Sequence, residues 1–383
     1  MKLFTLTLIT AGLLFSCEKT DTEPKEQYNC ITESVVPKGD RKVGMDILDL
    51  NESDDFERNM AIATDMGIEF LPMHFDWNFI ETSPGIYEDT YSFLELISLF
   101  ASQNDLNLSL TLRPIDIPGK TVPSDLFETR FNNPQMINRF AQLIDFIFTI
   151  VDPDLVMNFQ IGNEIDGYDT SNEPATFWND YGIFLQEITA YFHTNYPGIK
   201  TGFTATFDGL TENPERYNTL LQNVDVLGAT YYPHINGFNV QDPDCPFNEL
   251  ADLVSHYDTK PIYIQEIGYQ TSGVNNSSEY KQAEFYCNLF KAWDLHATQI
   301  ETLSIVRLND LSMQGAEESA GPYGLNNENF IEYLRTLGIR TFENEGTNKQ
   351  AFDIIKTGMK NRGWQEKYKS YKILTHKNKL MQS

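Results

Sequence analysis

The feature that most constrains the fold is a repeated alternation between short apolar runs and amphipathic helical patterns along residues 43–359. Short apolar runs bounded by turn residues are typical of buried strands, whereas apolar residues spaced by three and four are typical of helices. The sequence predicts strands at 43–47, 68–73, 106–112, 155–161, 200–206, 224–230, 262–266 and 303–306. Helices are predicted from Ser53 and at 91–102, 137–151, 177–192, 247–257, 279–296 and 352–359. This alternation predicts an α/β fold, a single (β/α)8 TIM barrel over residues 38–364, rather than two domains.

The beginning of the chain carries a targeting segment. Lys2 supplies a positive charge, and the apolar stretch at 3–15 is too short for a membrane-spanning helix. The run Leu14-Phe15-Ser16-Cys17 resembles a bacterial lipobox, in which the cysteine becomes lipidated. We therefore expect residues 1–17 to be a lipoprotein signal and Cys17 to hold the protein in the cell envelope, at the outer membrane. Polar residues 18–37 are expected to form a flexible tether, and basic residues 365–383 a solvated tail.

The net charge of −27 restricts the partners of the protein. An acidic chain is a poor ligand for nucleic acid or for anionic membrane surfaces, so neither is expected as a partner. The charge fits a neutral substrate acted on outside the cytoplasm by a monomer without a cofactor. Among Cys30, Cys245 and Cys287 at most one disulfide can form, and the helical pattern around Cys287 suggests a buried thiol.

Two of the predicted strands end in a glutamate. The fourth run ends at Asn163-Glu164, and the seventh ends at Glu266, 102 residues later. A carboxylate at the mouth of a buried strand is costly unless it has a partner or a function. In barrels of this kind reactive groups lie at the carboxyl ends of the strands, so the two glutamates should face each other across the mouth. Glycoside hydrolysis needs such a pair, although two charges that merely sit on loops remain an alternative.

The motifs around these glutamates resemble glycoside hydrolase clan A. Gln160-Ile161-Gly162-Asn163-Glu164-Ile165 is similar to the acid/base motif of the family 53 endo-β-1,4-galactanases, and residues 225–233 and 260–269 resemble their sixth and seventh strands. The phrase Trp77-Asn78-Phe79-Ile80-Glu81 is similar to one found after strand two in several clan A families. The resemblance implies a retaining, endo-acting enzyme that cuts a plant or algal polysaccharide. A β-galactan is the first choice, and a β-1,3-glucan, β-mannan or xylan is the alternative.

The resemblance also implies roles for individual residues. Glu164 would be the acid/base, Glu266 the nucleophile, and Tyr231 the hydroxyl that holds the nucleophile in place. For Tyr231 and Tyr232 packing is the alternative, and one of the two should pack, because neighbours on a strand face opposite ways.

Further residues are candidates for contacts with a sugar. Asn163 is placed to bond the sugar 2-hydroxyl. His74 and His234 lie at strand ends, where they could bind sugar hydroxyls or be structural. Arg113 could orient a catalytic carboxylate or pair with an acid of the barrel. Trp77 is a candidate stacking platform, although burial is the commoner fate of an aromatic side chain.

Two other classes of function compete with the hydrolase. A non-catalytic lipoprotein that binds glycans at the cell surface would not need two acids across a pocket. A metal-dependent hydrolase would need clustered His and Asp ligands at strand ends, and no His-x-His or equivalent pattern is found, so no metal is expected.

Overall fold

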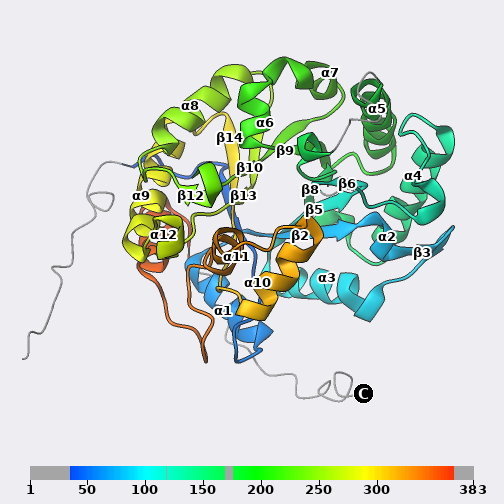
Figure 1. Cartoon of the computed structure of the whole chain (residues 1–383). Coiled ribbons are helices and arrows are strands. Elements are labelled where there is room, and N and C mark those ends of the chain that lie inside the picture. Colours follow the sequence, from blue (N-terminus) through cyan, green and yellow to red (C-terminus); the bar gives the residue numbers. More distant parts are fainter. Residues whose placement is uncertain (1–34, 118, 169–175, 366–383) are drawn as a thin grey trace, which may run out of the picture.

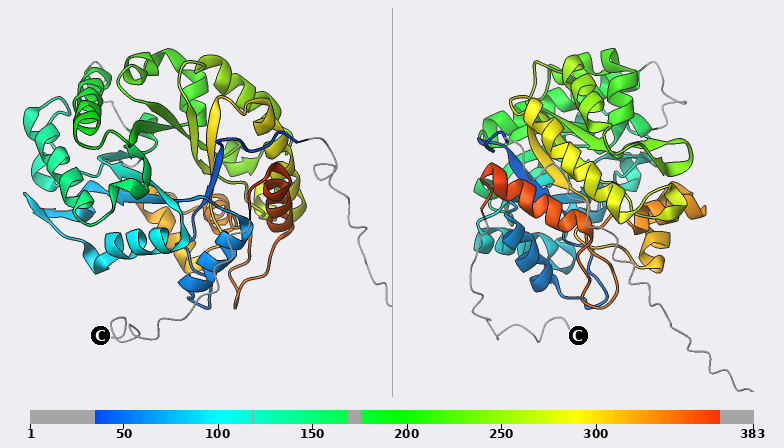
Figure 2. Two further views of the ribbon diagram at one scale, coloured as in Figure 1. Left: turned by 180° about the vertical axis from the view of Figure 1, so that it is seen from behind. Right: turned by 90° about the vertical axis from the view of Figure 1, so that its left-hand side faces the viewer.

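The computed structural model describes residues 35–117, 119–168 and 176–365. The expected signal with Cys17, most of the tether, Cys30 and the basic tail lie outside the described residues. Within the described part, eight parallel strands close a barrel in the order β1-β14-β13-β10-β9-β8-β5-β2, with helices around it (Figures 1 and 2). The predicted (β/α)8 barrel is therefore confirmed.

Each barrel strand is followed by at least one helix. The strands are β1 (Lys42–Met45), β2 (Phe70–Asp76), β5 (Asn107–Arg113), β8 (Val156–Ile161), β9 (Lys200–Thr206), β10 (Val226–Tyr231), β13 (Ile262–Ile267) and β14 (Ile300–Ile305). The helices are α1 (Phe56–Met66), α2 (Trp77–Ile80), α3 (Phe93–Asn104), α4 (Pro134–Phe148), α5 (Phe177–Asn195), α6 (Phe207–Glu212), α7 (Asn218–Leu221), α8 (Pro246–His256), α9 (Glu279–Leu295), α10 (Met313–Ala320), α11 (Glu328–Arg335) and α12 (Gln350–Arg362).

Short hairpins and 3-10 turns lie in the loops between the barrel strands and the helices. Three hairpins are formed by β3 (Glu81–Ser83) with β4 (Ile86–Tyr87), β6 (Ile115–Asp116) with β7 (Gly119–Lys120), and β11 (His234–Ile235) with β12 (Asn239–Val240). The 3-10 turns are η2 (Thr90–Ser92), η3 (Ser124–Leu126), η4 (Pro153–Leu155), η5 (Ile165–Gly167), η6 (Pro214–Tyr217), η7 (Asn236–Phe238), η8 (Gly273–Asn275) and η9 (Gly321–Tyr323).

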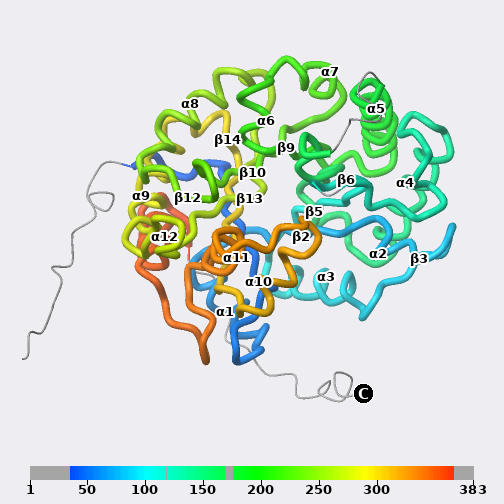
Figure 3. Tube along the Cα trace, in the orientation of Figure 1, coloured from blue at the N-terminus to red at the C-terminus, as the bar shows by residue number. Residues whose placement is uncertain are grey.

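The two ends of the described chain meet. β1 pairs with β14, and the backbone N–H of Lys38 donates to the carbonyl of Arg362 at 2.7 Å. The Cα trace of Figure 3 accordingly shows the blue start and the red end of the chain side by side. This closure of the sheet leaves the barrel without an exposed strand edge.

Helix boundaries follow from capping residues. The first helix begins at Phe56 because the side chain of Asp55 accepts a hydrogen bond from the N–H of Arg58. Ser53 is not the cap that the sequence suggests, because its hydroxyl donates to Asn51 at 2.5 Å. The same helix ends at Gly67, whose φ of +93° is a conformation that glycine adopts without strain.

The interior of the barrel is unusually polar. Leucines 108, 110 and 112 of β5 are buried, and between them Ser109 donates to Oε1 of Gln265 on β13 at 2.9 Å. Gln160 on β8 fits only because its neighbours are glycines: a Cβ on Gly202 would lie 2.4 Å from its Oε1. Barrel interiors are ordinarily filled by branched apolar side chains, so this lumen is shaped by hydrogen-bonding groups instead.

The cysteines differ from the expectation. Cys287 on α9 is buried, but it is disulfide-bonded, whereas Cys245 is a free thiol. The prediction of a buried Cys287 thiol is therefore wrong, because a burial pattern does not reveal whether a second cysteine reaches the site. No helix in the described ranges is long and apolar enough to cross a membrane.

Candidate active site

The first glutamate, Glu164, is held in a strained turn directly after β8. Gly162 has φ +85°, and a Cβ there would lie 2.4 Å from the hydroxyl oxygen of Tyr181, so only glycine fits. Glu164 itself has φ +42°, which is uncommon for a residue with a side chain and is often found at functional sites. Its side chain is buried, and Oε1 accepts a hydrogen bond from the hydroxyl of Thr230 at 2.6 Å.

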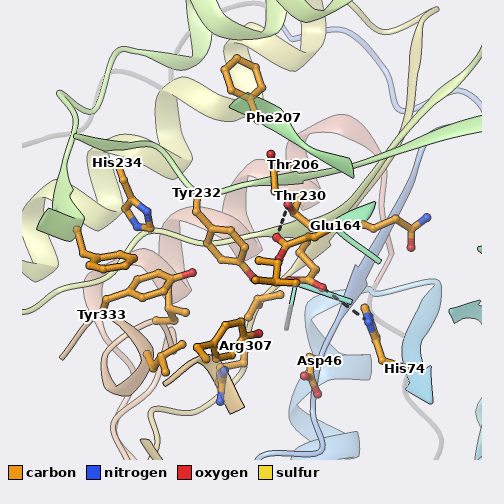
Figure 4. A pocket seen from close by; sticks show the side chains of 18 of the residues that line it. Asp46, His74, Glu164, Thr206, Phe207, Thr230, Tyr232, His234, Arg307 and Tyr333 are labelled. Atoms are coloured by element: carbon orange, nitrogen blue, oxygen red, sulfur yellow. Dashed lines mark hydrogen bonds and ion pairs between the residues drawn. The ribbon is translucent and has the colours of Figure 1, made fainter. Parts of the chain in front are cut away.

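The second glutamate, Glu266, lies near the end of β13. Its Oε2 accepts a hydrogen bond from the hydroxyl of Tyr232 at 2.6 Å, and Nδ1 of His74 lies 3.7 Å from its Oε1. Both glutamates line one cavity of about 490 Å³ at the carboxyl ends of the strands. Figure 4 shows the side chains of Glu164, Tyr232 and His74 pointing into this cavity. The structure thus brings the two predicted carboxylates together.

The two carboxylates have different electrostatic surroundings. Burial, and then the charge of Glu266, raises the pKa of Glu164 well above its ordinary value. Burial also raises the pKa of Glu266, but the hydrogen bond from Tyr232 and the nearby guanidinium groups of Arg113 and Arg307 oppose that rise. Of the two carboxyl groups, Glu164 has the surroundings that favour the protonated form more strongly.

Three predicted residues lie around Glu266. Burial, and then the charge of Arg113, lowers the pKa of His74 to about 4, so this imidazole is neutral at pH 7. Arg113 lines the cavity and pairs with Asp76 and Asp116, each at 2.7 Å. Asn163 is buried, and its Nδ2 donates to Asp116 at 3.3 Å. Arg113 thus pairs with acids at the strand ends, and its charge also acts on the catalytic candidate Glu266.

His234 lies on the opposite wall of the cavity. Its ring meets the ring of Tyr333 edge to face, with centroids 4.5 Å apart, and Figure 4 shows the two side by side. Burial lowers its pKa to about 4, so this histidine is also neutral at pH 7. Its Nε2 is buried and has no hydrogen-bond partner among the described residues. A hydrogen bond with the side chain of Gln270 opposes the lowering of the pKa of His234 by burial.

Tyr231 does not have the role that the resemblance implied. Its side chain is fully buried, and its hydroxyl donates to Oε2 of Glu249 on α8. Tyr232, the next residue, bonds Glu266 instead. The choice between the two tyrosines was therefore wrong, since alternate side chains point to opposite faces of the sheet and Tyr231 points outward to the helices.

Trp77 is not a stacking platform. Its side chain is fully buried at the start of α2, and Nε1 donates to Oε2 of Glu81 at 2.6 Å. Glu81 also accepts from Nε of Arg139 at 2.9 Å. The segment Trp77–Glu81 therefore contributes to a buried hydrogen-bond network beside the barrel. Trp77 is not exposed to the cavity, so it cannot stack on a sugar as expected.

Several residues that line the cavity were not anticipated. Asp46 follows β1, and its pKa is raised to about 6 by burial and then by the charge of Asp49. Arg307 follows β14 and pairs with Asp49 at 2.6 Å. Figure 4 shows Asp46 near His74 and Arg307 below Tyr232. The rule that selected Glu164 and Glu266, a polar residue at the end of a barrel strand, also selects Asp46 and Arg307.

A metal centre finds no support in the described part of the chain. There, no group of three or more His, Cys, Asp or Glu side chains could hold a metal ion. The charged groups at the cavity are instead paired acids and arginines.

Comparisons with known proteins give a fold likeness only. No family model matches the sequence, and no curated protein matches it. Solved structures do match. An exo-β-1,4-mannosidase from Opitutaceae bacterium strain TAV5 has a TM-score of 0.64 at 16% identity, over 84% of this chain and 60% of that one. A GH5_18 variant from Bifidobacterium longum in complex with Manβ1-4GlcNAc has a TM-score of 0.63 at 12% identity, over 85% and 79%. A family 39 glycoside hydrolase from Bacteroides cellulosilyticus WH2 has a TM-score of 0.56 at 12% identity, over 84% and 64%.

Proposed function

We propose that this protein is a retaining β-glycoside hydrolase in which Glu164 is the acid/base and Glu266 the nucleophile. The observation that carries this proposal is the pair of carboxyl groups in one cavity with different surroundings. The carboxyl group of Glu164 accepts a hydrogen bond from Thr230 and has a strongly raised pKa, whereas Glu266 has a phenol donor and two nearby arginines. Environments that push two carboxyl groups apart in pKa identify the acid and the base. The likeness to solved glycoside hydrolases and the resemblance to clan A agree with this proposal.

The reaction would follow two steps. In the first, the carboxylate of Glu266 attacks the anomeric carbon, and the bond to the leaving oxygen breaks as Glu164 donates its proton to that oxygen. In the second, Glu164 takes a proton from water, the hydroxide attacks the anomeric carbon, and the ester bond to Glu266 breaks. Each step inverts the anomeric carbon, so the product keeps the β configuration.

The charges of the cavity favour a neutral sugar. The guanidinium of Arg113 is paired with Asp76 and Asp116, and that of Arg307 is paired with Asp49. A sugar carboxylate would have to displace one of these partners next to two catalytic acids, which costs free energy. The net charge of −27 also disfavours an anionic polymer.

A β-mannoside is the first candidate for this sugar. The structural likenesses lend no support to the galactan that the motifs suggested, whereas the similar structures include an exo-β-1,4-mannosidase and a complex with Manβ1-4GlcNAc. We therefore rank β-mannosides first and β-galactosides second, ahead of β-glucosides and β-xylosides.

A substrate panel with three variants tests the function. The panel contains 4-nitrophenyl β-glycosides of these sugars, with β-mannan, β-galactan, β-1,3-glucan and xylan. Glu164→Ala should lose ~10²–10⁴-fold on the polysaccharide, the usual contribution of an acid catalyst, and much less in the first step with the nitrophenyl leaving group. Glu266→Ala should be inactive on both, and a fluorinated sugar should label Glu266 in the wild type. The control Asp252→Asn removes an exposed carboxylate on α8 and should keep full activity.

Two results of these assays would contradict the proposed function. Equal losses for Glu164→Ala on both substrates would contradict its role as the acid. Binding of a polysaccharide by wild-type protein that hydrolyses none of the panel would favour the glycan-binding lipoprotein instead.

A further inference from the structure

The segment between β14 and α12 is a large excursion on the wall of the cavity. We call residues 306–349, which contain α10, η9 and α11, the β14–α12 excursion. It has an apolar core of its own, made by Val306, Leu311, Ala316, Ala320, Phe330, Tyr333, Leu334 and Leu337. Figure 1 shows α10 and α11 in orange in front of the barrel strands, and the right-hand view of Figure 2 shows them projecting from one end of the barrel.

The excursion is fixed to its neighbours. Asn329 donates to the carbonyl of Gly237 in the β11–β12 hairpin at 3.0 Å, and its own carbonyl accepts from Asn275 at 2.9 Å. Ser272 donates to Oε2 of Glu332 at 2.8 Å. A side chain buried in an apolar cluster and tied by such bonds is held in place, so the excursion is a wall rather than a loose loop.

The excursion reaches the catalytic carboxylates. Tyr323, Leu325, Phe330, Tyr333, Leu334 and Leu337 line the cavity. Tyr323 therefore shares one cavity with Glu164 and Glu266. Burial, and then the charges of Asp116, Glu164 and Glu266, raises the pKa of this phenol. The excursion, which follows β14, thus forms part of the wall of the cavity that holds both glutamates.

The direction of a bound glycan follows from the catalytic pair. Glu164 must lie beside the leaving oxygen, so the leaving group lies on the β8 side of the cavity. The sugar that is transferred to Glu266 extends from the anomeric carbon away from Glu164. In the closed order of strands, β14 is four strands from β8 in either direction and so lies opposite to it. The non-reducing end of the bound sugar therefore points at the β14–α12 excursion.

We propose that the β14–α12 excursion closes the glycone end of the cavity, so that the protein removes single sugars from the non-reducing ends of its substrate. This inference rests on the proposed hydrolase function and replaces the endo action expected from the sequence. A chain that continued past the reacting sugar would meet the wall formed by Tyr323, Leu325 and Tyr333. The leaving-group side is bordered by Phe207 and Asp208 of α6, the helix that follows β9 beside β8.

Labelled oligosaccharides test the mode of attack. The probes are β-1,4-mannohexaose and β-1,4-galactohexaose with a fluorescent label at the reducing end, each also with a methyl ether on the terminal 4-hydroxyl of the non-reducing end. The expected result is a labelled product shortened by one sugar at a time, release of monosaccharide, and resistance of the methylated probe. Early appearance of labelled products several sugars shorter, or equal cleavage of the methylated probe, would overturn the inference while leaving the hydrolase function intact. Absence of hydrolysis of every probe and every nitrophenyl glycoside would overturn both.

A variant pair assigns the effect to the wall. Removal of residues 313–335 could unfold the protein, so the informative variant is the double replacement Tyr323→Ala and Leu325→Ala, whose side chains are each 38% exposed. It should cleave the methylated probe at least about tenfold faster than the wild type, the effect of relieving about 1.4 kcal/mol of steric conflict. The control Tyr91→Ala changes a tyrosine that is 90% exposed and outside the cavity, and it should behave as wild type. An unchanged preference in the double variant would show that the wall does not set the mode of attack.

Discussion

The hydroxyl of Tyr232 donates a hydrogen bond of 2.6 Å to Oε2 of Glu266. Burial favours the protonated form of this carboxyl group, and the phenol donor opposes it by stabilising the anion. The ionised form of Glu266 is thus stabilised by a residue one position away from the tyrosine that the motif indicated.

Loss of this hydrogen bond should move the pH profile. In Tyr232→Phe the pKa of Glu266 rises, so the acidic limb of kcat/KM should shift to higher pH. A hydrogen bond to a charged group contributes ~1.5–3 kcal/mol, which corresponds to about one to two pH units. The control is Tyr231→Phe, because the hydroxyl of Tyr231 bonds Glu249 away from the cavity. If both variants shift the limb equally, the tuning of Glu266 by Tyr232 is refuted.

Trp77 should matter for stability and not for substrate binding. In Trp77→Phe the buried carboxylate of Glu81 loses one donor, which should lower the free energy of unfolding by about 2–3 kcal/mol. KM should not change, because the indole does not line the cavity. Chemical denaturation and steady-state kinetics measure the two effects. Trp178→Phe, on the outer helix α5, is the matched control and should cost less than about 1 kcal/mol. A raised KM with unchanged stability would restore the stacking role.

Asp46 should make stability depend on pH. Its folded pKa of about 6 lies above the unfolded value of about 3.9, so its contribution to the free energy of unfolding is present below pH ~4 and is lost as the pH rises through 6. Asp46→Asn cannot ionise and escapes this loss. The difference in unfolding free energy between variant and wild type should therefore grow in favour of the variant by about 2–2.5 kcal/mol between pH 4 and pH 8. Denaturant titrations at both pH values measure it, and a constant difference would argue against a buried, proton-binding Asp46.

Cys17 should determine where the protein is found. In cells, the wild type is expected in the membrane fraction, released by detergent, because of a lipid on Cys17. Cys17→Ala should move to the soluble fraction with unchanged specific activity, since the change lies far from the barrel in sequence. Cys245→Ala, which alters the free thiol at the start of α8, should fractionate as wild type. Retention of Cys17→Ala in the membrane fraction would contradict the lipid anchor.

The barrel and its two acids could be predicted from the sequence because both depend on local signals. The alternation of apolar and polar residues around Leu108, Leu110 and Leu112 predicts a strand. Glu164 is a candidate because it directly follows an apolar run. The predicted helix boundaries were less accurate. Ser53 was expected to begin the first helix, but several residues near a helix start can cap it and only one does.

The remainder of the site depends on distant parts of the chain. Tyr333 reaches the cavity from α11, a helix that was not predicted although it carries an amphipathic pattern, and it packs with His234 from a hairpin almost a hundred residues earlier. Side chains alternate between the two faces of a strand, so only one of Tyr231 and Tyr232 can face Glu266. Two adjacent tyrosines in the sequence do not show which of them faces the interior of the barrel. The sequence indicates which polar residues lie at strand ends, whereas the packing of the loops determines which of these side chains contact one another in the cavity.

At Glu164, the residue type that the proposed reaction needs lowers the stability of the folded protein. Its φ of +42° is a conformation that asparagine and glycine adopt more readily, and its buried carboxyl group is desolvated beside a second acid. Replacing it with asparagine would relieve both costs, so an inactive protein should be harder to unfold than the active one. Selection for thermal stability alone, without a demand for turnover, would therefore tend to remove the acid.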